Sequence, residues 1–275
     1  MPIRVEAAPS FKDLVNNADR TIAGMFVCSG DAGIAEICAG SGIDYLLIDA
    51  EHGPNGLETV LAQLRAIAGY PAIPVVRVPF NDPVLIKQFL DIGAQSLIVP
   101  MVNNAEQAQA AVAAMHYPPR GIRGVGSALA RSARWNRIPD YLNRAEELVT
   151  LVVQVEAAEA VQNAAEIAAV DGIDGIFIGP SDLAASMGVL GQQEHPDVVA
   201  AVVKTIQDVK AAGKFVGVNA FVEASARRYV DAGADFVNVG ADVALLARGT
   251  EALAAKYIPE EAGVGAEAQA PRASY

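Results

Sequence analysis

Two stretches, Leu-Val-Val-Gln-Val-Glu (151–156) and Gly-Ile-Phe-Ile-Gly-Pro-Ser-Asp (175–182), decide the fold of this 275-residue chain. Each is a short apolar run that ends in an acidic residue, which is typical of a buried parallel strand with a carboxylate at its C-terminal tip. When such strands alternate with helices, their tips open on one face of the molecule. The two acids, Glu156 and Asp182, therefore indicate a divalent metal site, although each could instead cap the helix that follows it.

One pattern repeats around these stretches: a helix rich in Ala and Leu, a break that contains Gly, and a short β-branched run. The runs predict eight strands, at Thr21–Ser29, Tyr45–Asp49, Ile73–Pro79, Ser96–Pro100, Leu148–Glu156, Gly175–Ile178, Phe215–Asn219 and Phe236–Val239. Such alternation over about 240 residues predicts an α/β fold of the (β/α)8 or TIM barrel type. A doubly wound open sheet is the alternative. It is weakened because residues 29–33 (Ser-Gly-Asp-Ala-Gly) are spaced wrongly for a dinucleotide-binding loop.

We expect residues 1–258 to form one barrel domain, which includes an N-terminal helix that Ser10 caps. Residues 259–275 show no usable periodicity, and we expect a flexible C-terminal tail there. The connection 116–147 is rich in Arg and Pro and follows a predicted helix. Barrel logic places it on the face away from the strand tips, unless it packs against another subunit.

The composition excludes several classes of partner. Lys and Arg number 20 and Asp and Glu number 32, so the formal charge is −12, which makes nucleic acid and anionic membranes poor partners. Cys28 and Cys38 are too few for a disulfide framework, and the N-terminus has no apolar signal core. No apolar run approaches the roughly 18 residues that span a bilayer. A soluble cytoplasmic protein is the prediction.

The polar residues at the predicted strand tips should converge on one mouth. The three histidines are widely separated, which makes a zinc site of nitrogen and sulfur ligands hard to assemble. The carboxylates of Glu156 and Asp182, with waters, suit Mg²⁺ or Mn²⁺ and leave positions open for substrate oxygens. Residues 180–182 also open a helix, whose free N–H groups could hold a substrate carboxylate.

A cation and a histidine stand out at the second and third strand tips. Arg77 interrupts an apolar strand, and a buried guanidinium needs an anion. It either pairs with an acid of a neighbouring strand or stabilises an oxyanion formed in a reaction. His52 is the histidine at a strand tip, where Asp49 or Glu51 could orient it. We interpret His52 as a general base, with a structural role as the alternative.

These groups together suit deprotonation next to a carbonyl. A 2-oxo acid such as pyruvate fits, because its carboxylate and keto oxygens could chelate a metal that acts as a Lewis acid on the enolate. A lysine Schiff base is disfavoured, because none of the six lysines falls at a predicted strand tip.

The same residues, with their spacing, resemble the HpcH/HpaI family of metal-dependent (class II) pyruvate aldolases over about residues 22–257. The resemblance rests on the motifs at 49–55 (Asp-Ala-Glu-His-Gly-Pro-Asn), 74–77 (Pro-Val-Val-Arg), 81–83 (Asn-Asp-Pro), 99–101 (Val-Pro-Met), 117–126, 134–141, 154–156 (Gln-Val-Glu) and 179–182 (Gly-Pro-Ser-Asp). It implies reversible cleavage of 4-hydroxy-2-oxo acids to pyruvate, or an analogue such as hydroxypyruvate, and an aldehyde, with Mg²⁺, Mn²⁺ or Co²⁺ as cofactor.

The resemblance also implies roles for single residues. Glu156 and Asp182 would hold the metal, His52 would be the base and Arg77 would stabilise the enolate. Substrate contacts would come from Gln154, Ser181 and Asp182. Asp91 would raise the basicity of the histidine from a neighbouring subunit. The family often has alanine where Ser181 stands, which places the preference for the acceptor in question.

The resemblance further implies a homo-hexamer, built as a trimer of dimers, that exchanges a C-terminal helix at residues 241–257. Two other functions stay open. One is a CoA-ester lyase of the same superfamily, for which the sequence shows no basic recess of the size of adenine. The other is a barrel that binds 2-oxo acids without turnover, which would not need His52 and Arg77.

Overall fold

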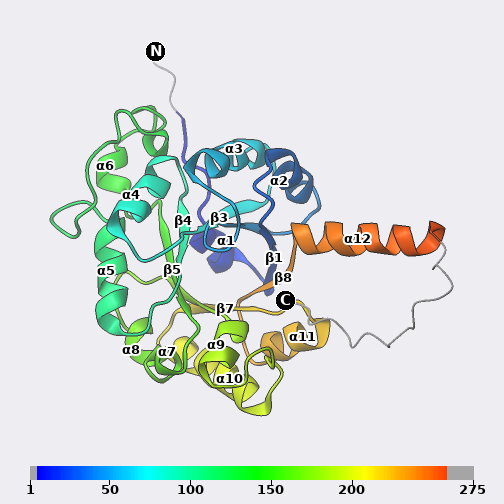
Figure 1. Cartoon of the computed structure of the whole chain (residues 1–275). Helices are drawn as coiled ribbons and strands as arrows, with labels where there is room; N and C mark the ends of the chain where they lie inside the picture. The colour runs from blue at the N-terminus through cyan, green and yellow to red at the C-terminus, as the bar shows by residue number, and fades with distance from the viewer. Residues whose placement is uncertain (1–4, 259–275) are drawn as a thin grey trace.

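The computed structural model, which describes residues 5–258, contains a closed barrel of eight parallel strands with helices around it (Figure 1). The strands pair in sequence order, and β8 pairs with β1 to close the barrel. Their bounds are β1 Ile22–Val27, β2 Tyr45–Asp49, β3 Ile73–Arg77, β4 Ser96–Val99, β5 Thr150–Val155, β6 Gly175–Ile178, β7 Phe215–Asn219 and β8 Phe236–Ala241. The predicted (β/α)8 barrel is confirmed, and the open-sheet alternative is wrong.

Helices connect the strands and form the outer layer (Figure 1). Their bounds are α1 Phe11–Asn17, α2 Ala32–Ala39, α3 Leu57–Ile67, α4 Pro83–Asp91, α5 Ala105–Met115, the 3₁₀ turn η1 Arg131–Ala133, α6 Tyr141–Arg144, α7 Ala158–Gln162, α8 Ala164–Ala168, α9 Pro180–Ser186, α10 Pro196–Ala211, α11 Glu223–Asp231 and α12 Asp242–Tyr257. Among residues 5–258, none of these helices combines the length and apolar character needed to cross a bilayer. The predicted tail at 259–275 lies outside the described residues.

In the barrel interior, glycines on some strands lie against large aromatic side chains on the neighbouring strands. Glycines point inward on β1, β6 and β7, and a Cβ on Gly24, Gly175 or Gly217 would lie 2.2 Å from an aromatic ring carbon on the neighbouring strand. The rings that fill this space belong to Tyr45, Phe215 and Phe236. Because the glycines leave that space empty, the aromatic rings can pack into one layer inside the barrel, on the side away from the strand tips.

The helix α1 closes the end of the barrel opposite the strand tips. Ser10 caps it through a capping box with Asp13, as predicted. Phe11 is fully buried and its ring meets those of Tyr45 and Phe236 edge-on at centroid distances of 5.0 Å each. The side chains of Ser96 and Thr150, at the starts of β4 and β5, accept hydrogen bonds from backbone N–H groups of α1. The amino end of the barrel is therefore closed by α1, and the end at the strand tips is the one that can hold a functional site.

The connection 116–147 packs at this same closed end, where it was predicted. Arg131 donates to the carbonyl of Ile92, just after α4, at 3.1 Å. Within the connection Arg123 is fully buried, lies over the ring of Tyr117 at 4.6 Å and pairs with Asp91 at 3.1 Å. The connection thus attaches to the final turn of α4 and leaves the strand tips open.

Removing the aromatic plug is expected to destabilise the barrel. Phe11→Ala deletes a fully buried ring that closes the interior, and we expect a loss of about 3–5 kcal/mol in the free energy of unfolding, measured by urea denaturation. Asn16→Ala, an exposed position on the same helix, is the matched control and should change it little. Equal stability of the two variants would show that α1 does not close the core.

Candidate active site at the strand tips

The carboxyl ends of β2, β3, β5 and β6 bring the predicted side chains to one mouth. Strand register does this directly, because Asp49 of β2 is paired with Arg77 of β3. Gln154 lies near the end of β5, and Glu156 is the first residue after that strand. Asp182 lies in the first turn of α9, just after β6. Seven of the eight predicted site residues therefore lie at this end of the barrel, with His52 following β2 and Ser181 following β6; Asp91 is the exception.

Arg77 and Asp49 form a buried, two-pronged ion pair. Nε of Arg77 donates to Oδ1 of Asp49 at 2.9 Å and Nη2 donates to Oδ2 at 2.8 Å, with both side chains under a tenth exposed. The guanidinium also lies over the ring of Phe26, 4.9 Å from its centroid. This is the pairing with a neighbouring strand's acid that the sequence left open as one role of Arg77. It uses Nε and Nη2 and leaves Nη1 for other partners.

Gln154 links this ion pair to Glu156. Its Oε1 accepts from Nη1 of Arg77 at 3.4 Å, and its Nε2 donates to Oε2 of Glu156. The other oxygen of Glu156 accepts from the backbone N–H of Met101 at 2.9 Å. Glu156 is only 3% exposed, so its carboxylate is held by two donors in a buried position.

The mouth holds more negative than positive charge. Glu51 lies 2.9 Å from Nη1 of Arg77. Burial raises the pKa of Glu51 and of Glu156 to about 7 each, and the nearby charge of Asp182 adds to both shifts. The positive charge of Arg77 is already paired with Asp49. The remaining acids are therefore short of a cation.

This excess of carboxylate fits a divalent cation. Glu156 and Asp182 offer only oxygen, which suits Mg²⁺, Mn²⁺ or Co²⁺ better than a soft metal. Within residues 5–258, no group of three or more His, Cys, Asp and Glu side chains is arranged to hold a metal ion. A metal held by these two residues would take its other ligands from water and substrate.

His52 follows β2 and extends away from the ion pair. Its side chain is 67% exposed, and Nε2 lies 3.8 Å from Oε2 of Glu51, whereas Asp49 accepts only the backbone N–H of His52, at 3.5 Å. Of the two acids proposed to orient the imidazole, Glu51 is the one near the ring. The exposed ring can still reach a substrate that enters the mouth.

Ser181 lies beside Asp182, and its hydroxyl is engaged, since Oγ is 2.8 Å from Oε1 of Gln193. Asp91 is the last residue of α4, which runs back from the strand tips, and it pairs with Arg123 at the opposite end of the barrel. Asp91 therefore does not approach His52 of its own chain. A contact between them requires a second subunit.

Sequence reasoning missed two participants. The backbone of Met101 has a φ of 58°, a left-handed conformation that is uncommon for residues other than glycine. In this conformation its N–H donates to Glu156. Glu51 was considered only as a partner of His52, yet it also pairs with Arg77. The motif at 99–101 contained Met101, but no residue type signals a left-handed methionine.

Comparison with known proteins identifies the family of this chain. The model of the HpcH/HpaI aldolase/citrate lyase family matches residues 22–249. A 4-hydroxy-2-oxo-heptane-1,7-dioate aldolase of Salmonella dublin is 55% identical over 252 residues, covering 92% of this chain and 95% of that protein. The protein of the same name from Salmonella typhi is 55% identical over 257 residues, covering 94% and 97%.

Solved structures give the same result. A HpcH/HpaI aldolase/citrate lyase family protein from Burkholderia cenocepacia superposes with a TM-score of 0.85 at 40% identity, covering 89% of this chain and 97% of that one. The HpcH/HpaI aldolase from Desulfitobacterium hafniense has a TM-score of 0.82 at 25% identity, covering 94% and 100%. The barrel, its polar mouth and these matches lead to one assignment: this chain belongs to the HpcH/HpaI aldolase/citrate lyase family.

Proposed function

We propose that this protein is a metal-dependent aldolase that reversibly cleaves 4-hydroxy-2-oxo acids into pyruvate, or a close analogue, and an aldehyde. The observation that supports it most is the chain of contacts from Asp49 through Arg77 and Gln154 to Glu156. This chain of contacts connects a fixed cation, Arg77, through Gln154 to Glu156, a carboxylate whose own donors are neutral and which would suit a metal. The name shared by the 55% identical relatives agrees with this reaction.

Glu156 and Asp182 would hold the cation, and a bound cation would act as a Lewis acid on the oxygens of a 2-oxo acid. Arg77 supplies a second, permanent positive charge, and its Nη1 faces Gln154 and Glu51 rather than Asp49. Because Asp49 fixes the other two nitrogens, Nη1 is held in place, and it could meet a developing enolate oxygen in exchange for its contact with Glu51 or Gln154. Gln154, held between Arg77 and Glu156, is placed to contact the substrate.

His52 would move the proton at the carbon next to the carbonyl. Its exposed imidazole lies beside Glu51, with Nε2 at 3.8 Å from Oε2 of that residue. We further propose that Asp91 of a neighbouring subunit assists this histidine, because Asp91 lies at the opposite end of the barrel from the His52 of its own chain. Ser181 would bind substrate through its backbone, since its hydroxyl is already bonded to Gln193.

The proposed assembly is a hexamer, a trimer of dimers that exchange α12. This helix extends beyond the ring of helices around the barrel (Figure 1), and it exposes large apolar side chains along its length. Leu245, Leu246 and Leu253 are each more than half exposed. Such a surface needs a partner, and the exchanged helix of a second copy would cover it. A cytoplasmic location stays a prediction.

Exchange of the methyl protons of pyruvate with solvent deuterium, followed by NMR, tests the proposed function. A chelator should abolish the exchange and Mg²⁺, Mn²⁺ or Co²⁺ should restore it. His52→Ala should slow exchange by about 10²-fold or more, the usual effect of losing a general base, while pyruvate binding survives. His195→Ala, a histidine whose ring caps the start of α10, is the control. Full exchange in metal-free protein would contradict the proposal.

A double substitution separates the two roles of Arg77. Arg77→Met leaves Asp49 buried and unpaired, so we expect a loss of about 3–5 kcal/mol in the free energy of unfolding. Proton exchange should fall by about 10²- to 10³-fold, as when an oxyanion donor is removed. Adding Asp49→Asn should recover much of the stability, measured by urea denaturation, without recovering exchange. If exchange returns with stability, the ion pair is only structural.

The assembly can be tested on α12. Leu246→Asp with Leu253→Asp places two charges on its exposed apolar surface, so we expect a smaller particle in analytical ultracentrifugation while the circular dichroism of the barrel is retained. Leu190→Asp makes the same change at an exposed residue on a loop and serves as the control. An unchanged sedimentation coefficient in the double variant would rule out exchange of α12.

A further inference from the structure

A row of residues crosses the mouth from β5 to β8 beyond the groups discussed so far. The register of β5, β6 and β7 pairs Val155 with Ile178 and Ile178 with Val218, so the next residues, Glu156, Gly179 and Asn219, follow one another across the barrel. Asn219 is paired in turn with Asn238 of β8. A carboxamide pair therefore stands in the same row as the proposed metal carboxylate, separated from it only by a glycine.

Gly179 keeps this part of the mouth narrow and polar. A Cβ at this position would lie 3.0 Å from Oε2 of Glu156 and 3.3 Å from Nε2 of Gln154. Backbone of β6 thus lies directly against the Glu156 carboxylate. A substrate bound at Glu156 meets Asn219 as the next side chain in the row.

Asn238 is fully buried and its amide is only partly satisfied. Its Nδ2 donates to Oδ1 of Asn219 at 3.4 Å, while its own Oδ1 has no hydrogen-bond partner among the described residues. Buried amide oxygens without a partner are rare in folded proteins. A purely structural role therefore explains this pair poorly. Asn238 donates to the amide oxygen of Asn219, which leaves the N–H groups of the Asn219 amide for other partners.

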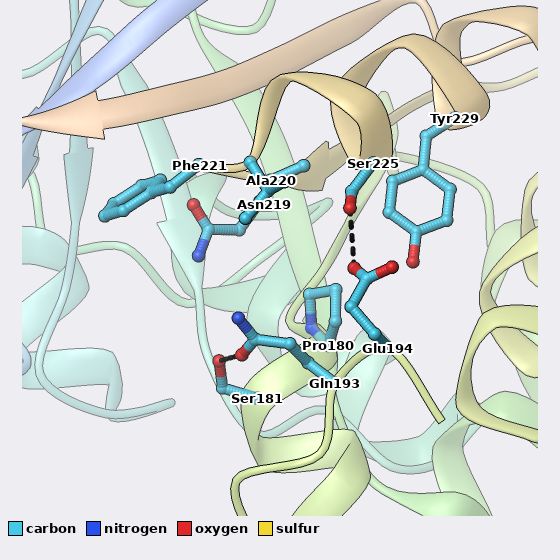
Figure 2. A pocket seen from close by; sticks show the side chains of 10 residues that line it. Pro180, Ser181, Gln193, Glu194, Asn219, Ala220, Phe221, Ser225 and Tyr229 are labelled. Atoms are coloured by element: carbon cyan, nitrogen blue, oxygen red, sulfur yellow. Dashed lines mark hydrogen bonds between the residues drawn. The ribbon is translucent and has the colours of Figure 1, made fainter. Parts of the chain in front are cut away.

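Asn219 lines a cavity that also includes Ser181. Figure 2 shows the carboxamide of Asn219 across this cavity from the hydrogen-bonded pair of Ser181 and Gln193. Glu194 contributes a carboxylate to the wall, where Ser225 donates to it at 2.6 Å and Arg228, behind the lining, pairs with it at 2.8 Å. None of the ten described residues that line the cavity is Lys or Arg. The other polar groups of the lining are neutral, so a neutral group that both donates and accepts hydrogen bonds fits it better than a carboxylate does.

We propose that Asn219, positioned by Asn238 and facing Ser181, binds a hydroxyl group of the substrate and makes the enzyme selective for hydroxylated substrates. The inference rests on the proposed function and names its substrate class. Two sources of the hydroxyl share this chemistry. One is a 3-hydroxy-2-oxo acid donor, represented by hydroxypyruvate, and the other is a 2-hydroxyaldehyde acceptor, represented by glycolaldehyde.

The test compares matched substrates with and without the hydroxyl. For the donor, proton exchange is measured with hydroxypyruvate and with pyruvate, and no aldehyde is added. For the acceptor, aldol formation from pyruvate is measured with glycolaldehyde and with acetaldehyde. For each comparison, we take the ratio of kcat/KM for the substrate with the hydroxyl to kcat/KM for the substrate without it. Asn219→Leu, which keeps the size but removes the amide, should reduce this ratio by about 10-fold or more in one arm of the test, either donor or acceptor. The arm that changes identifies the source of the hydroxyl.

Asn238→Ala should lower the same ratio in the same arm, because Asn219 loses the partner that orients it. General structural damage would lower both members of a pair equally and leave the ratio unchanged. Ser225→Ala, in the same cavity but bonded to Glu194, is the control and should keep the wild-type ratio. Wild-type ratios in both arms for Asn219→Leu, or an equal change in Ser225→Ala, would overturn the proposal.

Binding keeps the inference testable apart from turnover. Calorimetry of each hydroxylated probe and its plain partner, with Mg²⁺ present, should show a wild-type preference for the hydroxylated compound in the responding arm. Asn219→Leu should lose that preference. Failure of proton exchange in the wild type would overturn the proposed aldolase and leave this preference intact, whereas equal affinities in the wild type would overturn the subsite alone.

Discussion

The buried ion pair between Asp49 and Arg77 is the interaction on which the mouth of the barrel depends. Burying a lone guanidinium or a lone carboxylate costs several kcal/mol, so each residue is tolerated only because the other is one strand away and in register. The two-pronged geometry then fixes the plane of the guanidinium. Because Nε and Nη2 of this planar group are both held by Asp49, the direction of the third nitrogen, Nη1, is fixed as well. Nη1 contacts Gln154 and Glu51.

The same geometry explains why the acids around Glu156 remain available. Asp49 takes up most of the positive charge of Arg77, and Glu51 shares what is left. In the described part of the chain, the donors to Glu156 are neutral: the amide of Gln154 and the N–H of Met101. Burial raises the pKa of Glu156 to about 7. Hydrogen bonds orient this carboxylate without neutralising it. A site that positions a carboxylate but withholds a counter-charge is suited to a metal cation rather than to a permanent salt bridge.

Much of the fold and part of the site could be predicted from the sequence, and the division has a physical basis. Strand runs such as Tyr45–Asp49 and Gly175–Ile178 were predicted with their observed bounds, because β-branched runs between glycines depend on local preferences. The convergence of Asp49, Arg77 and Glu156 followed from barrel topology alone. Which acid pairs with Arg77 could not be predicted, since that depends on side-chain direction across two strands. The left-handed turn at Met101 and the opposite placement of Asp91 likewise depend on tertiary context.

The two ends of the barrel divide stability from chemistry, and this division makes the polar mouth possible. At the closed end, Phe11 and the rings of Tyr45 and Phe236 form an apolar plug, for which Gly24 and Gly217 make room. Burial of that surface stabilises the barrel without help from the mouth. The layer above it can then contain groups that weaken a core. Among them are an acid with a raised pKa and the amide oxygen of Asn238, which has no hydrogen-bond partner within residues 5–258. Since the aromatic layer does not need them for folding, these groups are free to be selected for what they bind.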